Sequence, residues 1–296
     1  MNLPERTEGY LSVLGHKLYF EAFGDPNSKE KILCLHGGPG TPHNYMLSLA
    51  DLAKSGFYVI FYDQLGVGKS ELSKNLTLFT VECYVEEVEE FRKQMGLNNF
   101  HLFGSSWGGF LGIAYALKYQ TNLKTFTSAG GASSTLLTYR EMLRLKSEMP
   151  LEIVETLEKY EERGEYENPE YVKDLDVVYH KHVCRLEKWP EEVSYATNHT
   201  SKPVYNTMWG PNEFTMYGNL MYWDVTSKLG TIQIPTLLTC GRYDEVTPKV
   251  QQVLREGIPG SELEIFEQGS HLTFWEEREK YMKTVVDFLD HKSSPM

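Results

Sequence analysis

The chain has 296 residues, of which 41% are hydrophobic and 24% are charged, and its formal net charge is −12. This composition indicates a globular protein with a large core, and no apolar run is long enough to span a membrane. The negative charge and the lack of a Lys/Arg run exclude nucleic acid as a partner. Met1–Tyr10 carries no basic and apolar signal pattern, so we expect a cytoplasmic protein.

Short strand-like runs alternate with amphipathic helical stretches through the first 130 residues, and this alternation is typical of a parallel sheet with helices on both faces. The expected strands are Ile32–Leu35, Tyr58–Tyr62, Phe100–Phe103 and Leu123–Ser128, and the expected helices lie around 44–54, 80–96 and 107–119. Before them, Tyr10–Leu14 and Lys17–Ala22 flank Gly15–His16 and predict an antiparallel hairpin at the sheet edge.

The pattern changes after Gly130, where helical spacing such as Met142, Leu145 and Met149 replaces the alternation. Strand-like runs resume at Thr236–Thr239 and Leu263–Phe266, with helical segments near 248–256 and 277–290. The sequence therefore predicts one α/β domain formed by residues 1–130 and 229–296, interrupted by a helical cap insertion at 131–228.

The motif Gly104-Ser105-Ser106-Trp107-Gly108 lies between an expected strand and an expected helix. A G-x-S-x-G nucleophile elbow requires this setting, because the sharp turn lifts the Ser hydroxyl above the sheet and the flanking glycines avoid backbone clashes. Ser105 lacks glycines at the flanking positions, so Ser106 is the predicted nucleophile of an α/β-hydrolase fold.

A carbonyl attacked by Ser106 would need N–H donors for its developing oxyanion. The stretch His36-Gly37-Gly38-Pro39-Gly40 directly follows the strand at 32–35 and has the form of an oxyanion loop. We expect the two donors to be the backbone N–H groups of Gly38 and of Trp107.

The other triad members are expected in the order acid, then histidine. Asp244 follows the strand at 236–239, and His271 follows the last strand at 263–266. In these positions His271 would exchange a proton with Ser106, and Asp244 would orient the imidazole and stabilise its charged form.

Other motifs carry weaker functional hypotheses. Gly66-Val67-Gly68-Lys69-Ser70 imitates a phosphate-binding loop, but the required first glycine is replaced by Asp63, so we read 63–70 as a turn. His180-Lys181-His182 lacks the further ligands of a metal site and is interpreted as a solvated helix face, as are the acids in 82–90. The four separated cysteines indicate neither disulfides nor zinc, and we expect no metal and no cofactor.

These motifs together resemble the prolyl aminopeptidase (proline iminopeptidase) family, in particular its archaeal tricorn-interacting branch. The resemblance covers nearly the whole chain, and Gly210-Pro211-Asn212-Glu213-Phe214 inside the insertion is its most particular segment. It implies a serine aminopeptidase that removes the first residue, preferably Pro, from short peptides with a free amino terminus. Glu213 and Glu245 match the acids with which the family holds the substrate ammonium group, and a larger upstream protease is an implied partner.

The insertion should also supply an apolar pocket for the first side chain. Its candidate wall residues are Trp107, Tyr205, Trp209, Phe214, Trp223 and Phe274.

Two other functions use the same fold. A carboxylesterase or other small-molecule hydrolase would share the triad, because fold and triad do not determine the acyl substrate. A catalytically silent binding protein is disfavoured by the intact Ser, Asp and His set.

Overall fold

The computed structural model describes residues 5–293, and within this range eight strands form a single sheet with the order β1-β2-β4-β3-β5-β6-β7-β8. The strands are β1 (Arg6–Val13), β2 (His16–Phe23), β3 (Lys31–Leu35), β4 (Tyr58–Tyr62), β5 (Phe100–Ser105), β6 (Leu123–Ala129), β7 (Thr236–Gly241) and β8 (Glu262–Phe266). All pairs from β4 to β8 are parallel. The predicted hairpin is confirmed as antiparallel β1–β2 at the sheet edge.

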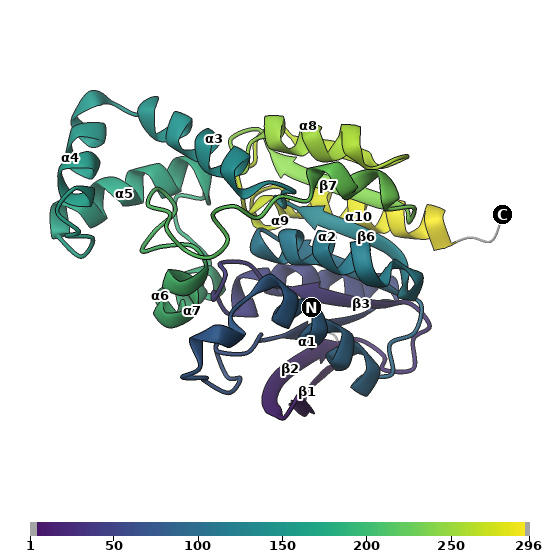
Figure 1. Ribbon diagram of the computed structural model, residues 1–296. Coiled ribbons are helices and arrows are strands. Elements are labelled where there is room, and N and C mark those ends of the chain that lie inside the picture. Colours follow the sequence, from purple (N-terminus) through teal and green to yellow (C-terminus); the bar gives the residue numbers. More distant parts are fainter. Residues whose placement is uncertain (1–4, 294–296) are drawn as a thin grey trace.

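Helices cover both faces of the sheet, as predicted (Figure 1). The first-half helices are η1 (His43–Ser55), η2 (Leu76–Leu78), α1 (Val81–Gln94), α2 (Trp107–Tyr119) and η3 (Gln120–Asn122). The last part of the chain forms η4 (Thr226–Thr231), α8 (Pro248–Gly257), α9 (Thr273–Glu276) and α10 (Arg278–Ser293). The segment expected as a helix at 44–54 is a 3-10 helix.

Alternating residues of the buried strands divide the core into two layers. In β3, Leu33 and Leu35 belong to the layer formed with α1, α2 and α8, whereas Ile32 and Cys34 belong to the layer formed with η1 and α10. A strand buried on both faces must be apolar at every position, which explains the continuous hydrophobic run in β3. Cys34 and Cys240 are buried free thiols, as their apolar surroundings predict.

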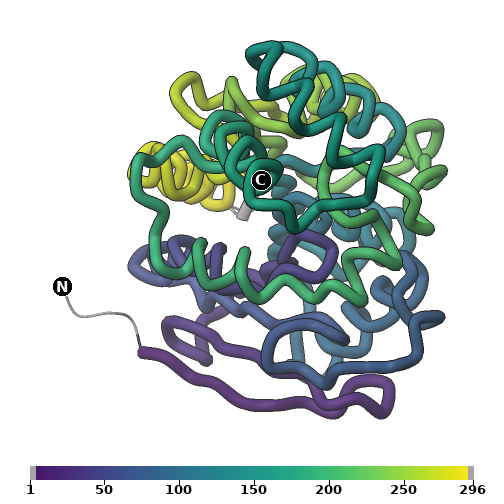
Figure 2. The backbone as a smooth tube through the Cα atoms, turned by 90° about the vertical axis from the view of Figure 1, so that its left-hand side faces the viewer, coloured from purple at the N-terminus to yellow at the C-terminus, as the bar shows by residue number. Residues whose placement is uncertain are grey.

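Five α-helices lie between β6 and β7 in the chain: α3 (Thr135–Ser147), α4 (Leu151–Glu161), α5 (Pro169–His182), α6 (Glu191–Asn198) and α7 (Lys202–Met208). They form a layer beside the sheet, and in Figure 2 this teal-to-green segment faces the viewer. α6 packs on η1, and α3 packs on α8, so the inserted helices contact the α/β part at separate points. No helix in the described range is long and apolar enough to cross a membrane.

Two interpretations of polar helix faces are wrong for some residues of each run. Glu87 and Glu89 of α1 are each only 5% exposed, although the acidic run predicted a solvated face. His182, at the end of α5, is also 5% exposed, whereas His180 reaches the surface. In each case part of a polar run faces another part of the protein that the local pattern does not reveal.

Candidate active site

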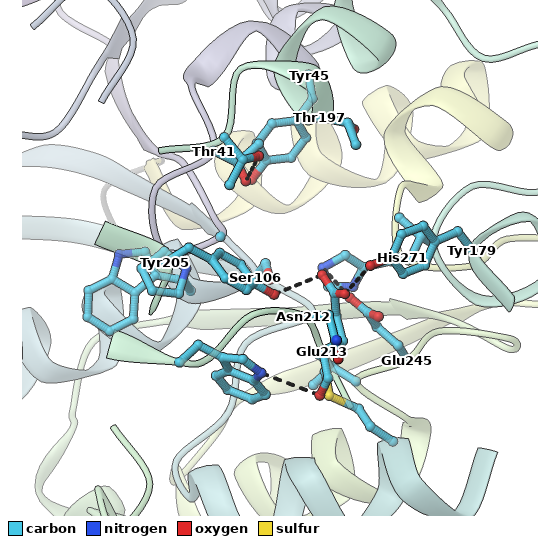
Figure 3. A pocket seen from close by; sticks show the side chains of 18 of the residues that line it. Thr41, Tyr45, Ser106, Tyr179, Thr197, Tyr205, Asn212, Glu213, Glu245 and His271 are labelled. Atoms are coloured by element: carbon cyan, nitrogen blue, oxygen red, sulfur yellow. Dashed lines mark hydrogen bonds and ion pairs between the residues drawn. The ribbon is translucent and has the colours of Figure 1, made fainter. Parts of the chain in front are cut away.

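The site lies where the loops after β3, β5, β6, β7 and β8 meet, at the carboxyl ends of parallel strands. A cavity of about 330 Å³ opens there between the sheet and the inserted helices, and Ser106 and His271 both line it. Figure 3 shows these two residues with Glu213 and Glu245 from other loops. The structure thus brings together residues that lie far apart in the sequence.

Ser106 occupies a strained turn between β5 and α2. Its φ of 56° and ψ of −124° are unusual for a residue with a side chain. The neighbouring glycines are required by close backbone packing, because a Cβ at Gly104 would lie 2.1 Å from the Gly108 oxygen and one at Gly108 would lie 2.0 Å from the Leu35 oxygen. This local geometry is that of the predicted nucleophile elbow.

His271 is paired with Asp244 across two loops. The His271 Nδ1–H donates to Asp244 Oδ1 over 2.7 Å, and that oxygen also accepts from the Val246 N–H. Both side chains are buried. His271 Nε2 has no hydrogen-bond partner among the described residues, so it is free to take a proton from a group in the cavity.

The charge of His271 is controlled by carboxylates on two sides. Burial acts to lower the pKa of His271, but Asp244 and Glu245 outweigh it and raise the pKa to about 9. Glu245 Oε1 lies 3.8 Å from His271 Nε2. An imidazole in this setting stabilises the positive charge that it acquires as a general base.

Two backbone N–H groups are the candidates to receive an oxyanion. Trp107 is the first residue of α2, where N–H groups have no partner within the helix. In the loop after β3, the Gly37 N–H is occupied by the Tyr45 hydroxyl at 2.7 Å, which leaves Gly38 as the candidate donor beside it. Gly38 has a φ of 106°, and a Cβ there would meet backbone nitrogens at 2.6 Å.

The turn at 63–70 supports this oxyanion region. Gln64 accepts the Trp107 indole N–H at 2.9 Å and donates to the His36 carbonyl at 3.0 Å, so it links Trp107 to the loop that contains Gly38. Asp63 accepts from the His43 ring at 2.7 Å and from the Lys69 N–H at 2.9 Å. The turn at 63–70 is therefore a structural element that supports the neighbouring loops through hydrogen bonds.

Glu213 and Glu245 face the same cavity from different parts of the chain. Glu213, in the inserted segment, accepts hydrogen bonds from the hydroxyls of Tyr205, at 2.9 Å, and of Tyr179. Burial raises the pKa of Glu245 to about 8; the His271 charge opposes this, and the Glu213 and Asp244 carboxylates add to it. The pair forms an acidic corner beside the His271 ring.

The cavity wall matches the predicted aromatic residues only in part. Trp107, Tyr205 and Trp209 line it. Phe214, Trp223 and Phe274 do not: they pack in or against the hydrophobic core. Tyr179 is a lining residue that could not be selected from the sequence, because no local pattern indicates its partner Glu213.

A family model described as the alpha/beta hydrolase fold matches residues 31–278. The chain is 44% identical over 285 residues to the proline iminopeptidase of Thermoplasma volcanium, covering 96% of both chains. It is 42% identical to the proline iminopeptidase of Saccharolobus solfataricus, covering 96% of this chain and 92% of the relative.

Two solved structures are similar over nearly their full length. The crystal structure of VinJ matches with a TM-score of 0.94 and 33% identity, covering 97% of this chain and 99% of the other. The proline iminopeptidase of Mycobacterium smegmatis matches with a TM-score of 0.90 and 30% identity, covering 97% and 98%.

Proposed function

Because the chain belongs to the proline iminopeptidase family of α/β-hydrolases, we propose that it is a serine aminopeptidase that releases an N-terminal residue, preferably Pro, from short peptides. The observation that carries this proposal is the placement of Glu213 and Glu245 in the cavity that holds Ser106 and His271. A carboxylate pair next to a nucleophile favours a substrate whose cationic amine lies one residue from the scissile bond.

In the proposed reaction Ser106 Oγ attacks the first carbonyl carbon while His271 Nε2 takes the hydroxyl proton. The backbone N–H groups of Gly38 and Trp107 stabilise the oxyanion, and Asp244 stabilises the imidazolium. His271 then gives the proton to the leaving peptide nitrogen, which leaves an aminoacyl ester on Ser106. A water, deprotonated by His271, hydrolyses that ester and frees the amino acid.

The acidic corner suits an N-terminal proline in particular. A pyrrolidinium has two N–H hydrogens, so one carboxylate from Glu213 and one from Glu245 satisfy it, whereas a primary ammonium leaves a third N–H to be solvated. Ionic pairing with the substrate would also keep Glu245 ionised against the burial that raises its pKa to about 8. The aromatic wall of Trp107, Tyr205 and Trp209 supplies apolar contact for the ring.

We further propose that residues 131–228 act as a cap that limits entry to short peptides, because this segment contributes a large part of the cavity wall. A cytoplasmic location and a larger upstream protease as a partner stay predictions from the sequence.

The deciding experiment compares prolyl, alanyl and phenylalanyl amide reporters with their N-acetylated forms and with a neutral butyrate ester. We expect the free-amine reporters to be cleaved, with prolyl fastest, and Ser106→Ala to abolish the cleavage. Cleavage of the ester alone would refute the aminopeptidase and support the carboxylesterase alternative. Labelling by a serine-directed phosphonate, absent in Ser106→Ala, separates both from a silent binding protein.

A further inference from the structure

The last turn of α5 contacts the site at two points. Tyr179 donates its hydroxyl hydrogen bond to Glu213, the proposed ammonium ligand. His182 lies three residues further along, so both side chains project from the same side of the helix. One helix end therefore reaches the acidic corner and the triad loops together.

The main chain at the end of α5 joins the two triad loops. The His182 carbonyl accepts the N–H of Glu245 at 3.3 Å and the N–H of His271 at 3.2 Å. The next carbonyl, that of Val183, accepts the N–H of Leu272 at 3.0 Å. Carbonyls at a helix C-terminus have no partner within the helix, and here the loops of the acid and the histidine use them.

The His182 side chain adds a third link. Its Nδ1 lies 2.7 Å from the carbonyl oxygen of Tyr243, the residue that precedes Asp244. A carbonyl only accepts, so Nδ1 carries the hydrogen and donates it. The ring is buried, and its Nε2 has no partner among the described residues, so this one bond fixes the ring to the acid loop.

We propose that His182 is a positioning residue that holds the loops of Asp244 and His271 at their working separation. Because His182 and Tyr179 both belong to α5, this helix of the inserted segment positions the acidic corner as well as the triad loops. This inference rests on the proposed role of the triad and assigns a function to a residue that does not touch the reacting atoms.

The test uses His182→Leu, which removes the donor at similar bulk, and His182→Asn, whose side-chain amide keeps a donor near the Nδ1 position. We expect the Leu variant to lose about tenfold in kcat, the effect of one buried hydrogen bond, with KM changed by less than about twofold. The loss should be equal on the prolyl reporter and on the neutral ester, because the triad serves both. The Asn variant should regain most of it.

A pH profile separates positioning from simple loss of stability. The facing Asp244 raises the pKa of His271, so a misaligned pair in the Leu variant should shift the acid limb of the kcat profile to lower pH. His180→Leu is the matched control, since His180 shares the helix and is more exposed. It should leave kcat and the profile unchanged.

Wild-type kcat and an unshifted profile in folded His182→Leu would overturn the inference. If that variant does not fold, His182→Ala with added imidazole replaces it: restored kcat supports the inference, and a folded variant that imidazole fails to restore overturns it. If the wild-type enzyme cleaves only the ester, the proposed aminopeptidase is refuted. The effect of the His182 variants on ester hydrolysis then still tests the inference. A wild type that cleaves neither substrate refutes the proposed function itself.

Discussion

The backbone of Gly130 packs closely against the His271 ring, which leaves no room for a side chain. A Cβ at Gly130 would lie 2.7 Å from His271 Cε1 and 2.9 Å from Nδ1, and the φ of this residue is 61°. We expect Gly130→Ala to push the ring away from Asp244 and to lower kcat/KM about a hundredfold, as small displacements of catalytic groups do. Steady-state kinetics on the prolyl reporter measure this loss.

The matched control for this substitution is Gly96→Ala, where φ is 64° but no atom lies within 4 Å of the added Cβ. The same backbone strain should lower its thermal stability by a similar amount in a denaturation experiment. Its kcat/KM should be unchanged. Equal kinetic losses in the two variants would show that strain, and not displacement of His271, is responsible.

The charge on Glu245 should be visible in the pH dependence. Because this carboxylate is one of the groups that raise the pKa of His271 to about 9, Glu245→Gln should lower that pKa. His271 acts as a base only when neutral, so the acid limb of neutral-ester hydrolysis should move to lower pH in the variant. The pH profile of kcat/KM for the butyrate ester measures the shift.

The same substitution should slow the cleavage of free-amine substrates, since they lose one of their two carboxylate partners. We expect Glu245→Gln to lower kcat/KM on the prolyl reporter by about tenfold or more, the value of a charge-assisted hydrogen bond. Glu267→Gln, on the exposed surface, should leave kcat/KM unchanged for both substrates. Equal losses on ester and prolyl reporter would contradict the ammonium role.

At the scale of elements, the elbow depends on how closely α2 approaches β3. A Cβ at Gly108 would lie 2.0 Å from the Leu35 carbonyl oxygen, which is rigid backbone. Gly108→Ala should therefore destabilise the fold by about 1–3 kcal/mol, the range for overpacked sites, and displace the oxyanion donors on both elements. Chemical denaturation measures the free energy of unfolding.

The control for α2 is Lys118→Ala at the exposed end of the same helix. Lys118 forms a solvent-screened surface ion pair with Glu86, so its loss should hardly change the free energy of unfolding. If the Gly108 variant were as stable as the Lys118 variant, α2 could shift without loss of folding stability, and the prediction would be contradicted.

The elbow could be predicted from sequence because its parts are adjacent in the chain: strand, Gly104, Ser106, Gly108 and helix. The same holds for the alternation of β3 to β6 with their helices along the chain. By contrast, the burial of His182 and Glu87 could not be predicted, because helical spacing shows which residues share a face and not what packs against it. Asp63 shows a further limit, since its partner His43 is twenty residues away and no motif joins them.

At the scale of the whole molecule, the inserted segment is fixed to the α/β part by a buried carboxylate. Glu141 of α3 accepts from Lys249 Nζ at 2.8 Å and from the Thr247 hydroxyl at 3.1 Å, both at the start of α8. The same helix supplies Thr138 and Met142 to the cavity wall. The triad loops, in contrast, are bonded to the end of α5. The inserted segment is therefore fixed at two different places, through α3 at the start of α8 and through α5 at the triad loops.

This separation predicts the kinetic effect of loosening α3. Glu141→Gln should lower the free energy of unfolding by about 1–2 kcal/mol, because it removes the charge from a buried carboxylate that accepts from Thr247 and from the more exposed Lys249. KM for the prolyl reporter should rise more than kcat falls, since the wall moves while α5 still holds Asp244 and His271 in place. Glu148→Gln is the control: Glu148 pairs with Arg144 at the exposed end of α3 and does not reach α8. A fall in kcat at constant KM would instead mean that α3 and α5 move as one unit and that the cap transmits its position directly to the triad.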